Sequence, residues 1–171
     1  MSGRPDASAL EAARNLEEMK RMREVEEEIL ARAPENDIGP SLERINAVME
    51  LAGDPQRSYP SIHLTGTNGK TSTSRMIDSI LRESGLSTGR FTSPHLHDIR
   101  ERITLSGKPI PREKFIAAYD EIAPLVEIVD ARSLEHGGRR MNFFEVLVAV
   151  AYAAFADAPV DVAIIEVGLG G

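Results

Sequence analysis

The segment Gly66-Thr67-Asn68-Gly69-Lys70-Thr71 has the residue types and spacing of a phosphate-binding loop. In such a loop several backbone N–H groups point at one spot, beside the positive end of a helix dipole. Lys70 can then reach the β- and γ-phosphates of a nucleotide, and the hydroxyl of Thr71 can face a magnesium ion. The loop is shorter than the full Walker A pattern, because Leu64 stands where that pattern has its first glycine. The alternative is a tight strand-to-helix turn with a surface lysine.

Glu166 lies near the end of 161–167, a largely β-branched run that predicts a strand buried on both faces of a parallel sheet. A buried carboxylate is costly unless it is paired, hydrogen-bonded or bound to a metal. We interpret Glu166 as a magnesium ligand, and the alternative is a structural salt bridge. Magnesium suits the position because it takes one or two hard oxygen ligands and completes its shell with water and phosphate.

The break 92–96 follows a predicted strand and contains Ser93 and His95. Taken alone, Ser93 before a proline indicates only a turn. His95 and His97 are a poor metal pair, and four histidines without cysteine form no zinc pattern. No serine lies in a nucleophile elbow, so the sequence indicates no Ser/His/Asp hydrolase.

Strand and helix patterns flank these segments. Alternation predicts a strand over 61–64, a weaker one over 87–91 and a hairpin over 102–110. A helix is expected from Lys70 to about residue 84, with one apolar face. That face is formed by Met76, Ile77, Ile80 and Leu81.

Two helices are expected before the glycine loop. The first covers about 9–33, carries charges of both signs on a thin apolar stripe, and ends at Pro34. The second begins near Ser41 and stops at 53–55. Its predicted buried face consists of Leu42, Ile45, Val48, Met49 and Ala52.

Two more helices are expected after the hairpin. One begins near Pro111, and Pro124 should kink or split it before a polar loop over 130–140. The other is capped by Asn142 and is apolar over 143–155 on so broad a face that we expect near-complete burial.

This alternation of strands and helices predicts an α/β fold with a mostly parallel sheet and helices on both faces. Ligands of such sheets bind beyond the carboxyl ends of the strands. The glycine loop, the break 92–96 and residues 166–171 all lie at such ends, so we expect one shared site.

Composition narrows the class of protein. The chain has 171 residues, a net charge of −7 and 42% hydrophobic residues, which is typical of a globular domain and argues against a general nucleic-acid binder. Without cysteine, disulfides and thiolate metal sites are excluded. No apolar run is long enough to cross a membrane, and the N-terminus has no signal-peptide pattern, so we expect a cytoplasmic protein without membrane or nucleic-acid partners.

Four motifs in series carry a family resemblance: 63–72, 91–96 followed by Glu101-Arg102-Ile103, 142–145 and 165–171. Together they resemble folylpolyglutamate synthase/dihydrofolate synthase, of the Mur-ligase superfamily. The resemblance covers Asp37 to Gly171 and implies the phosphate-loop fold of the Mur-ligase central domain. Residues 1–34 would then be a charged helical N-terminal extension, and 35–171 the N-terminal part of an ATP-binding ligase domain whose C-terminal partner domain is absent.

The resemblance implies an ATP-dependent amide ligase. ATP would phosphorylate a carboxylate of dihydropteroate or a folate, and the amine of L-glutamate would attack the acyl phosphate. Lys70 and Glu166 would be catalytic, residues 66–71 would hold the phosphates, and Ser93 would join Glu166 in binding Mg²⁺. The expected substrate contacts are those of His95, Asn142, Phe143, Phe144 and Glu145, with Ile38 to Ser41 as a further contribution.

The sequence also departs from the family. After the loop lysine the family commonly has a small residue or glycine, whereas this chain has Thr71, and Mur ligases also have threonine at this position. The family motif that contains Phe-Phe-Glu often starts with threonine, whereas here it starts with Asn142. A second metal ligand, a modified lysine, the adenine contacts and a C-terminal domain would follow Gly171. We therefore expect the fragment alone to be inactive and to expose apolar surface, whereas the full-length enzyme would be a monomer.

Two alternatives remain open. A cell-wall precursor ligase of the Mur type would need a separate N-terminal substrate domain, for which only about sixty residues precede the glycine loop. The other alternative is a fragment that binds a nucleotide without turning it over.

Overall fold

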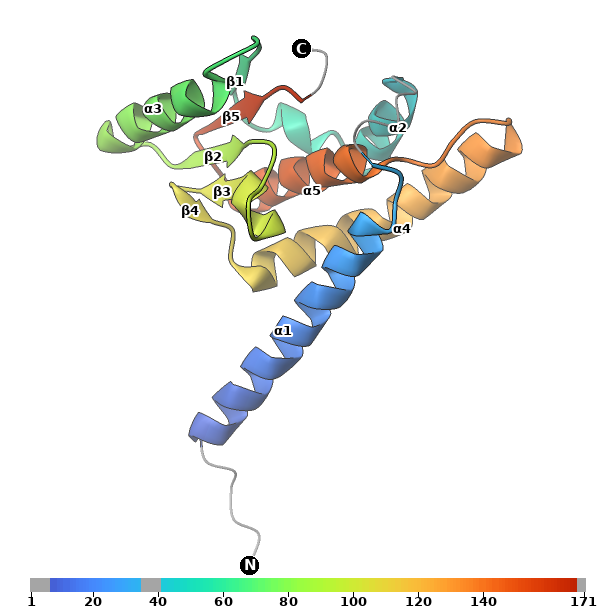
Figure 1. Ribbon diagram of the computed structural model, residues 1–171, viewed down its shortest axis with the longest axis horizontal. Helices are drawn as coiled ribbons and strands as arrows, with labels where there is room; N and C mark the ends of the chain where they lie inside the picture. Colours follow the sequence, from blue (N-terminus) through green and yellow to red (C-terminus); the bar gives the residue numbers. More distant parts are fainter. Residues whose placement is uncertain (1–6, 35–40, 169–171) are drawn as a thin grey trace, which may run out of the picture.

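A five-stranded sheet in the order β1-β5-β2-β3-β4 lies at the centre of the computed structural model, which describes residues 7–34 and 41–168 (Figure 1). The strands are β1 (Ser61–Leu64), β2 (Thr88–Phe91), β3 (Ile103–Leu105), β4 (Lys108–Pro109) and β5 (Val162–Glu166). β5 is parallel to both β1 and β2, whereas the β3-β4 hairpin continues the sheet antiparallel to β2. The predicted strands, the hairpin and the mostly parallel sheet are therefore confirmed.

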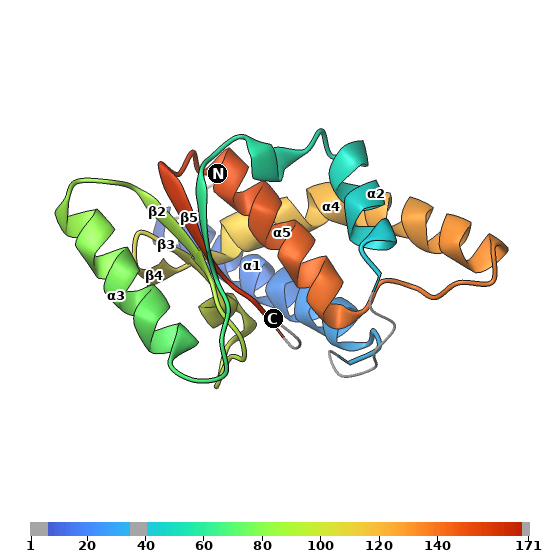
Figure 2. The same ribbon diagram turned by 90° about the horizontal axis from the view of Figure 1, so that it is seen from above.

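Helices cover both faces of the sheet, as expected from the alternation of elements. The helices are α1 (Ala7–Leu30), α2 (Glu43–Leu51), α3 (Lys70–Glu83), α4 (Arg112–Glu135) and α5 (Phe143–Asp157), with short 3₁₀ turns η1 (Pro55–Arg57) and η2 (Ile99–Arg102). Figure 2 shows α3 on one face, and α5 with α4 and α1 behind it on the other. β5 is buried along its whole length because a strand flanks each of its edges and helices cover each of its faces.

The main core lies on the α5 side of the sheet. α5 approaches β2 closely, because Gly89 has no side chain and the ring of Phe155 lies over it. A Cβ at Gly89 would stand 2.6 Å from that ring. Asn142 caps α5 as predicted, and the apolar residues of the helix are buried almost throughout.

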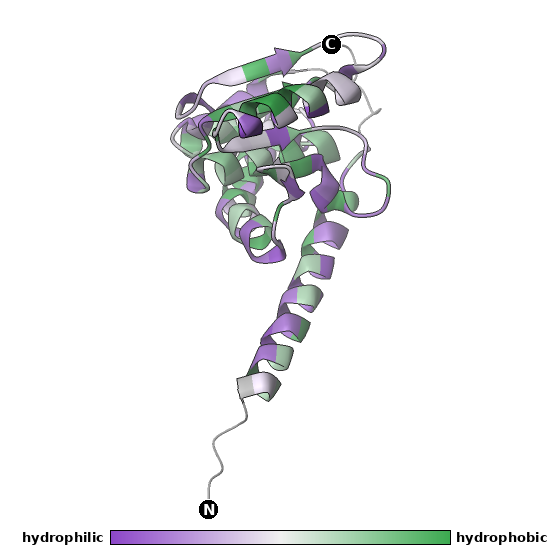
Figure 3. Ribbon diagram, turned by 90° about the vertical axis from the view of Figure 1, so that its left-hand side faces the viewer, coloured by the Kyte–Doolittle hydropathy of each residue, from purple (hydrophilic) through white to green (hydrophobic). Residues whose placement is uncertain are grey.

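The N-terminal helix divides into two parts. Its second half contributes Met22, Val25 and Ile29 to the core. Its first half projects from the body and carries hydrophilic and hydrophobic residues side by side (Figures 1 and 3). Two polar contacts attach α1 to α4: Tyr119 Oη donates to Glu28 at 2.8 Å, and Arg21 pairs with Asp120 at 2.6 Å.

The predicted apolar face of α3 is wrong for two of its members. Met76 and Ile80 are 58% and 65% exposed, whereas Ser74 and Asp78 face the sheet and are buried. The cause lies in the strand below, because the hydroxyl of Thr88 on β2 donates to the carboxylate of Asp78. Leu42, expected on the buried face of the second helix, is likewise exposed and stands just before α2.

The prediction for the region after Pro111 also needs correction. α4 runs unbroken from Arg112 to Glu135 with Pro124 inside it, so the proline does not split the helix and no loop begins at 130. Asp130 is buried instead, and accepts from Met141 N at 2.7 Å and from Arg32 Nη1 at 2.8 Å. Asp130, which its polar sequence context assigned to a loop, is thus a buried hydrogen-bond acceptor within the fold. Over the described ranges, no helix combines the length and apolar character needed to cross a membrane.

Candidate phosphate and substrate site

The glycine loop connects β1 to α3 as predicted. Gly69 precedes α3 in a left-handed conformation with φ 77°, which glycine adopts without the steric cost of a side chain. No side chain caps this end of α3 within the described residues, so the N–H groups of its first turn face the loop. Thr67 and Asn68 are exposed in the loop. The Lys70 ammonium donates to the carbonyl of Gly66 and thus lies across the loop that would hold phosphate.

Thr71 and Glu166 meet at the carboxyl ends of the parallel strands. The strand register sets Glu166 of β5 beside Leu64 of β1, directly under the start of α3. Thr71 Oγ1 lies 2.9 Å from both carboxylate oxygens of Glu166 and donates to them. Glu166 is 3% exposed, and no ion pair involves it within ranges 7–34 and 41–168. A buried carboxylate beside a hydroxyl is a hard oxygen pair of the kind that suits Mg²⁺.

A site built from three or more His, Cys, Asp or Glu side chains is absent from the described part of the chain. A magnesium ion at Glu166 would therefore depend on hydroxyl oxygens, water and phosphate for its remaining ligands, as magnesium commonly does.

Ser93 lies two residues beyond Phe91, the last residue of β2. Phe91 is in register with Ile165 of β5. Ser93 is half-buried, and its peptide bond to Pro94 is cis. Among the described residues, no hydrogen bond joins Ser93 to Glu166, so their shared metal ligation stays a prediction. The segment is attached at its far end, where Glu101 accepts from the N–H groups of Leu96 at 2.9 Å and His97 at 3.3 Å.

Arg102 connects this segment to α5. Its Nε donates to His95 Nδ1 at 2.8 Å, and its guanidinium lies 4.8 Å from the ring centroid of Phe143. Burial and the neighbouring guanidinium lower the pKa of His95, so the imidazole is neutral at neutral pH and accepts this hydrogen bond. Two predicted substrate residues are therefore joined through Arg102, whose role we did not predict although it belongs to the Glu101-Arg102-Ile103 motif.

Asn142 and Glu145 form a capping box at the start of α5. Asn142 Oδ1 accepts from Glu145 N at 2.9 Å, and Glu145 Oε2 accepts from Asn142 N at 2.8 Å. Arg44 of α2 pairs with the same carboxylate at 3.0 Å. These contacts are structural, and a substrate role for the two residues stays a prediction.

The two phenylalanines that begin α5 have different surroundings. Phe143 is buried in the core, whereas Phe144 is half-buried and packs edge-to-face on Phe91 with ring centroids 5.7 Å apart. Gly168, just beyond β5, lies against the same ring, and a Cβ there would stand 2.6 Å from it. Phe144 is therefore the better candidate for stacking on a substrate. Of the predicted contribution from Ile38 to Ser41, only Ser41 lies among the described residues.

Comparison with known proteins identifies relatives of this chain. No family model matches the chain. The dihydrofolate synthase/folylpolyglutamate synthase of Mycobacterium tuberculosis is 52% identical over 174 residues, covering 99% of this chain and 36% of that protein. The protein of the same name from Bacillus subtilis is 38% identical, covering 78% of this chain and 30% of its own length.

A solved structure agrees with these matches. Crystal structures of the Mycobacterium tuberculosis folylpolyglutamate synthase complexed with ADP and AMPPCP superpose with a TM-score of 0.82 at 51% identity. The match covers 90% of this chain and 33% of that one.

The fold and the site together define a phosphate-loop α/β unit of the Mur-ligase type. Within that class, the chain is homologous to the folylpolyglutamate synthase/dihydrofolate synthases, as the four motifs predicted. It spans about a third of the length of the relatives it matches. The match to the mycobacterial protein includes α1, and the division of the chain at residue 34 stays a prediction.

Proposed function

We propose that this chain is the phosphate-binding part of a ligase that uses ATP to join L-glutamate to dihydropteroate or a folate. The observation that carries the proposal is the contact of Thr71 with the buried Glu166 beside Lys70. This contact brings the glycine loop next to the carboxylate at the end of β5. ATP-using enzymes need a phosphate-binding loop and an acidic group close together. The names of the homologous proteins supply the substrate class.

The residues present suit phosphoryl transfer, which depends on positioning and charge neutralisation more than on covalent help from the protein. The N–H groups at the start of α3 and the Lys70 ammonium would hold the β- and γ-phosphates. Thr71, Glu166 and Ser93 would hold Mg²⁺, which when bound offsets phosphate charge. The substrate carboxylate would attack the γ-phosphorus, break its bond to the β,γ-bridging oxygen and release ADP, which leaves an acyl phosphate. The glutamate amine would then attack the acyl carbon, release inorganic phosphate and lose a proton to form the amide.

The other residues of the site would orient the substrate. The half-buried ring of Phe144 would offer a face to a flat pterin. Phe91 packs edge-to-face on this ring, and Gly168 leaves room for it because glycine has no side chain. Burial and the charge of Arg102 lower the pKa of His95, so the imidazole is neutral at neutral pH. Its Nδ1 accepts from Arg102, so its Nε2 carries the proton and can donate to a ligand.

Phosphate release by the protein expressed from its complete gene tests this function. We expect release only when ATP, dihydropteroate or a folate, and L-glutamate are all present. Lys70→Ala and Glu166→Gln should each lower the rate by about 100-fold or more, because each removes charge stabilisation at the transferred group. Lys108→Ala, on the exposed hairpin, is the matched control and should keep the wild-type rate. ATP binding without substrate-dependent release would instead leave a nucleotide-binding protein without ligase activity.

A further inference from the structure

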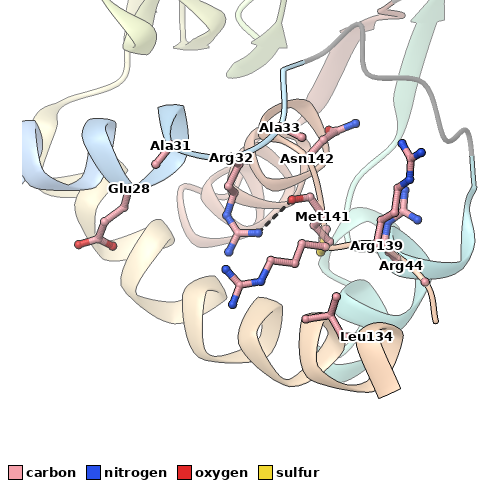
Figure 4. A pocket seen from close by; sticks show the side chains of 11 residues that line it. Glu28, Ala31, Arg32, Ala33, Arg44, Leu134, Arg139, Met141 and Asn142 are labelled. Atoms are coloured by element: carbon pink, nitrogen blue, oxygen red, sulfur yellow. Dashed lines mark hydrogen bonds between the residues drawn. The ribbon is translucent and has the colours of Figure 1, made fainter. Parts of the chain in front are cut away.

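The first half of α1, residues 7–20, projects from the body and is called the tip of α1 below (Figures 1 and 3). The body begins at Arg21, which pairs with Asp120 at 2.6 Å. The far end of α1 lines a cavity in the body, where Arg32 donates to the carbonyl of Met141 at 3.0 Å (Figure 4). The tip lies at the opposite end of α1 from this cavity and outside the four family motifs, so the site chemistry does not explain it.

An apolar stripe runs along the tip. Its members recur at spacings of three and four residues, as the a and d positions of a heptad do: Ala9, Ala12, Leu16 and Met19. All four are exposed, and the two large side chains are 53% and 50% exposed. The charged residues between positions 8 and 19 all lie on the other side of the helix: Glu11, Arg14, Glu17 and Glu18. The tip is therefore an amphipathic helix with its apolar side exposed.

The stripe points away from the side of α1 that packs on the body. The second half of the helix packs through Met22, Val25 and Ile29. At about 100° of rotation per residue, the stripe lies about 130° around the helix from these three residues. Because α1 is one continuous helix from Ala7 to Leu30, the tip does not rotate independently of the attached half. A partner for the stripe must therefore approach from outside this body.

A second copy of the same tip fits the stripe in an antiparallel pair. With the two-fold axis at position 14, Ala9 lies opposite Met19 of the second copy, and Ala12 lies opposite Leu16. Each large side chain thus meets a small one, and no charged side chain enters the seam. The stripe is self-complementary, as a two-fold symmetric interface requires.

The length of the tip favours the same arrangement. The midpoint of residues 7–20 falls beside position 14, so this axis pairs the whole tip, over about 21 Å, and the overlap ends where each body begins. A parallel pair would instead bring both bodies to the same end of the helices. Asn15 lies beside the axis, where two side-chain amides can hydrogen bond to each other and fix the register.

We propose that the tip of α1 is a dimerisation element, which pairs with the tip of a second copy as a short antiparallel coiled coil. The interface is small, so the dimer is weak and exchanges readily with monomer. The glycine loop lies on the far side of the body from the tip and stays free in both copies (Figure 1). This state differs from the monomer that the family resemblance implies, and it does not depend on the proposed function.

Sedimentation velocity on the protein from its complete gene tests the pairing. The wild type should show a monomer–dimer equilibrium. Leu16→Lys with Met19→Lys should raise the dissociation constant about tenfold or more, because charges enter an apolar seam. Leu10→Lys is the matched control and should keep the wild-type constant, since this residue is 51% exposed on the same tip but lies outside the stripe.

Two results of this measurement would overturn the proposal. One is a wild-type protein that stays monomeric up to the highest concentration measured, as happens when another part of the complete chain covers the stripe. The other is a dimer that Leu16→Lys with Met19→Lys leaves unchanged, which places the contact elsewhere, for example on the exposed side of α3. Both substituted residues are exposed, so matching circular dichroism spectra should show that the variant folds.

Cross-linking determines the direction of the pair. Residues 1–171 contain no cysteine, so single cysteines can be introduced once any cysteine beyond Gly171 is replaced by serine. Ala13→Cys lies one residue from the axis and should be joined to its counterpart by a short bismaleimide. Ala9→Cys should not, because the two copies of this residue lie about 15 Å apart along an antiparallel pair. Cross-linking at Ala9→Cys, or its absence at Ala13→Cys, would overturn the antiparallel arrangement.

Discussion

Arg90 is unusual for a residue within a sheet, because its charged side chain is buried. It lies on β2 facing α3, directly opposite Thr104 of β3, and both are buried. Neither Arg90 Nε nor Thr104 Oγ1 has a hydrogen-bond partner among the described residues. Burial lowers the pKa of Arg90, although the charges of Asp78 and Glu166 act in the opposite direction. A buried charge without a fixed partner is destabilising unless another group compensates for it.

We therefore expect Arg90→Met to raise the free energy of unfolding by about 1–3 kcal/mol, because an apolar chain of similar length avoids the desolvation cost. Urea denaturation monitored by circular dichroism measures this change. Arg14→Met, on the exposed first half of α1, is the control and should change stability by less than about 0.5 kcal/mol. A lower urea midpoint for Arg90→Met would show that the guanidinium is well compensated in the folded protein.

At the scale of elements, the site depends on segments that end at the same edge of the sheet. β1, β5 and β2 are parallel, so the glycine loop, Gly168 and the segment 92–96 all leave the sheet at that edge. Thr71 at the start of α3 then contacts Glu166 at the end of β5, and Arg102 of η2 contacts His95 in the segment 92–96. The segment after β2 is held by Glu101, which accepts from the N–H groups of Leu96 and His97, and by the contact of Arg102 with His95.

The His95 contact gives a pH dependence. Burial and Arg102 lower the folded-state pKa of His95, so below its ordinary value of 6.5 the unfolded chain binds a proton more readily than the folded one. Stability contributed by neutral His95 is thus present above pH 6.5 and is lost as pH falls below it. The melting temperature should therefore drop less in His95→Gln than in the wild type between about pH 7.5 and pH 5.5.

His97→Gln provides the control for this comparison, because His97 is an exposed histidine of the same segment. It should follow the wild-type curve. Equal pH profiles for wild type and His95→Gln, measured by thermal unfolding in matched buffers, would contradict the assigned role of His95.

At the scale of the whole molecule, one side of the fold is left open. β1 is an edge strand of the sheet and is only partly covered. On the neighbouring helix α3, Met76 and Ile80 point outward and are exposed. Unpaired strand edges and exposed apolar side chains favour association between molecules.

The 171-residue chain by itself should therefore self-associate at micromolar concentration, and sedimentation velocity measures this directly. Met76→Lys with Ile80→Lys should reduce association without lowering stability, because both side chains are exposed. Leu10→Lys on the projecting part of α1 is the control and should leave association unchanged. A compact monomer of the wild-type chain would contradict the prediction.

Much of this architecture was determined by local sequence. Glycine at a left-handed position, the cap at Asn142 and β-branched runs each act through backbone geometry or neighbouring residues, so the glycine loop, α5 and β5 could be predicted. Four motifs in order then sufficed to indicate the family. Glu166 could be singled out because a carboxylate in an apolar strand requires a partner.

Only the tertiary structure decided which residues meet. The buried face of α3 includes Ser74 and Asp78 rather than Met76 and Ile80, because Thr88 of β2 donates to the carboxylate of Asp78. Asp130 continues α4 because its buried carboxylate binds Met141 N and Arg32, partners distant in sequence. The cavity between the end of α1, the start of α2 and the segment from α4 into α5 is lined by residues that lie far apart in the sequence. Pairings of this kind depend on the packing of whole elements, which the local pattern of side chains does not contain.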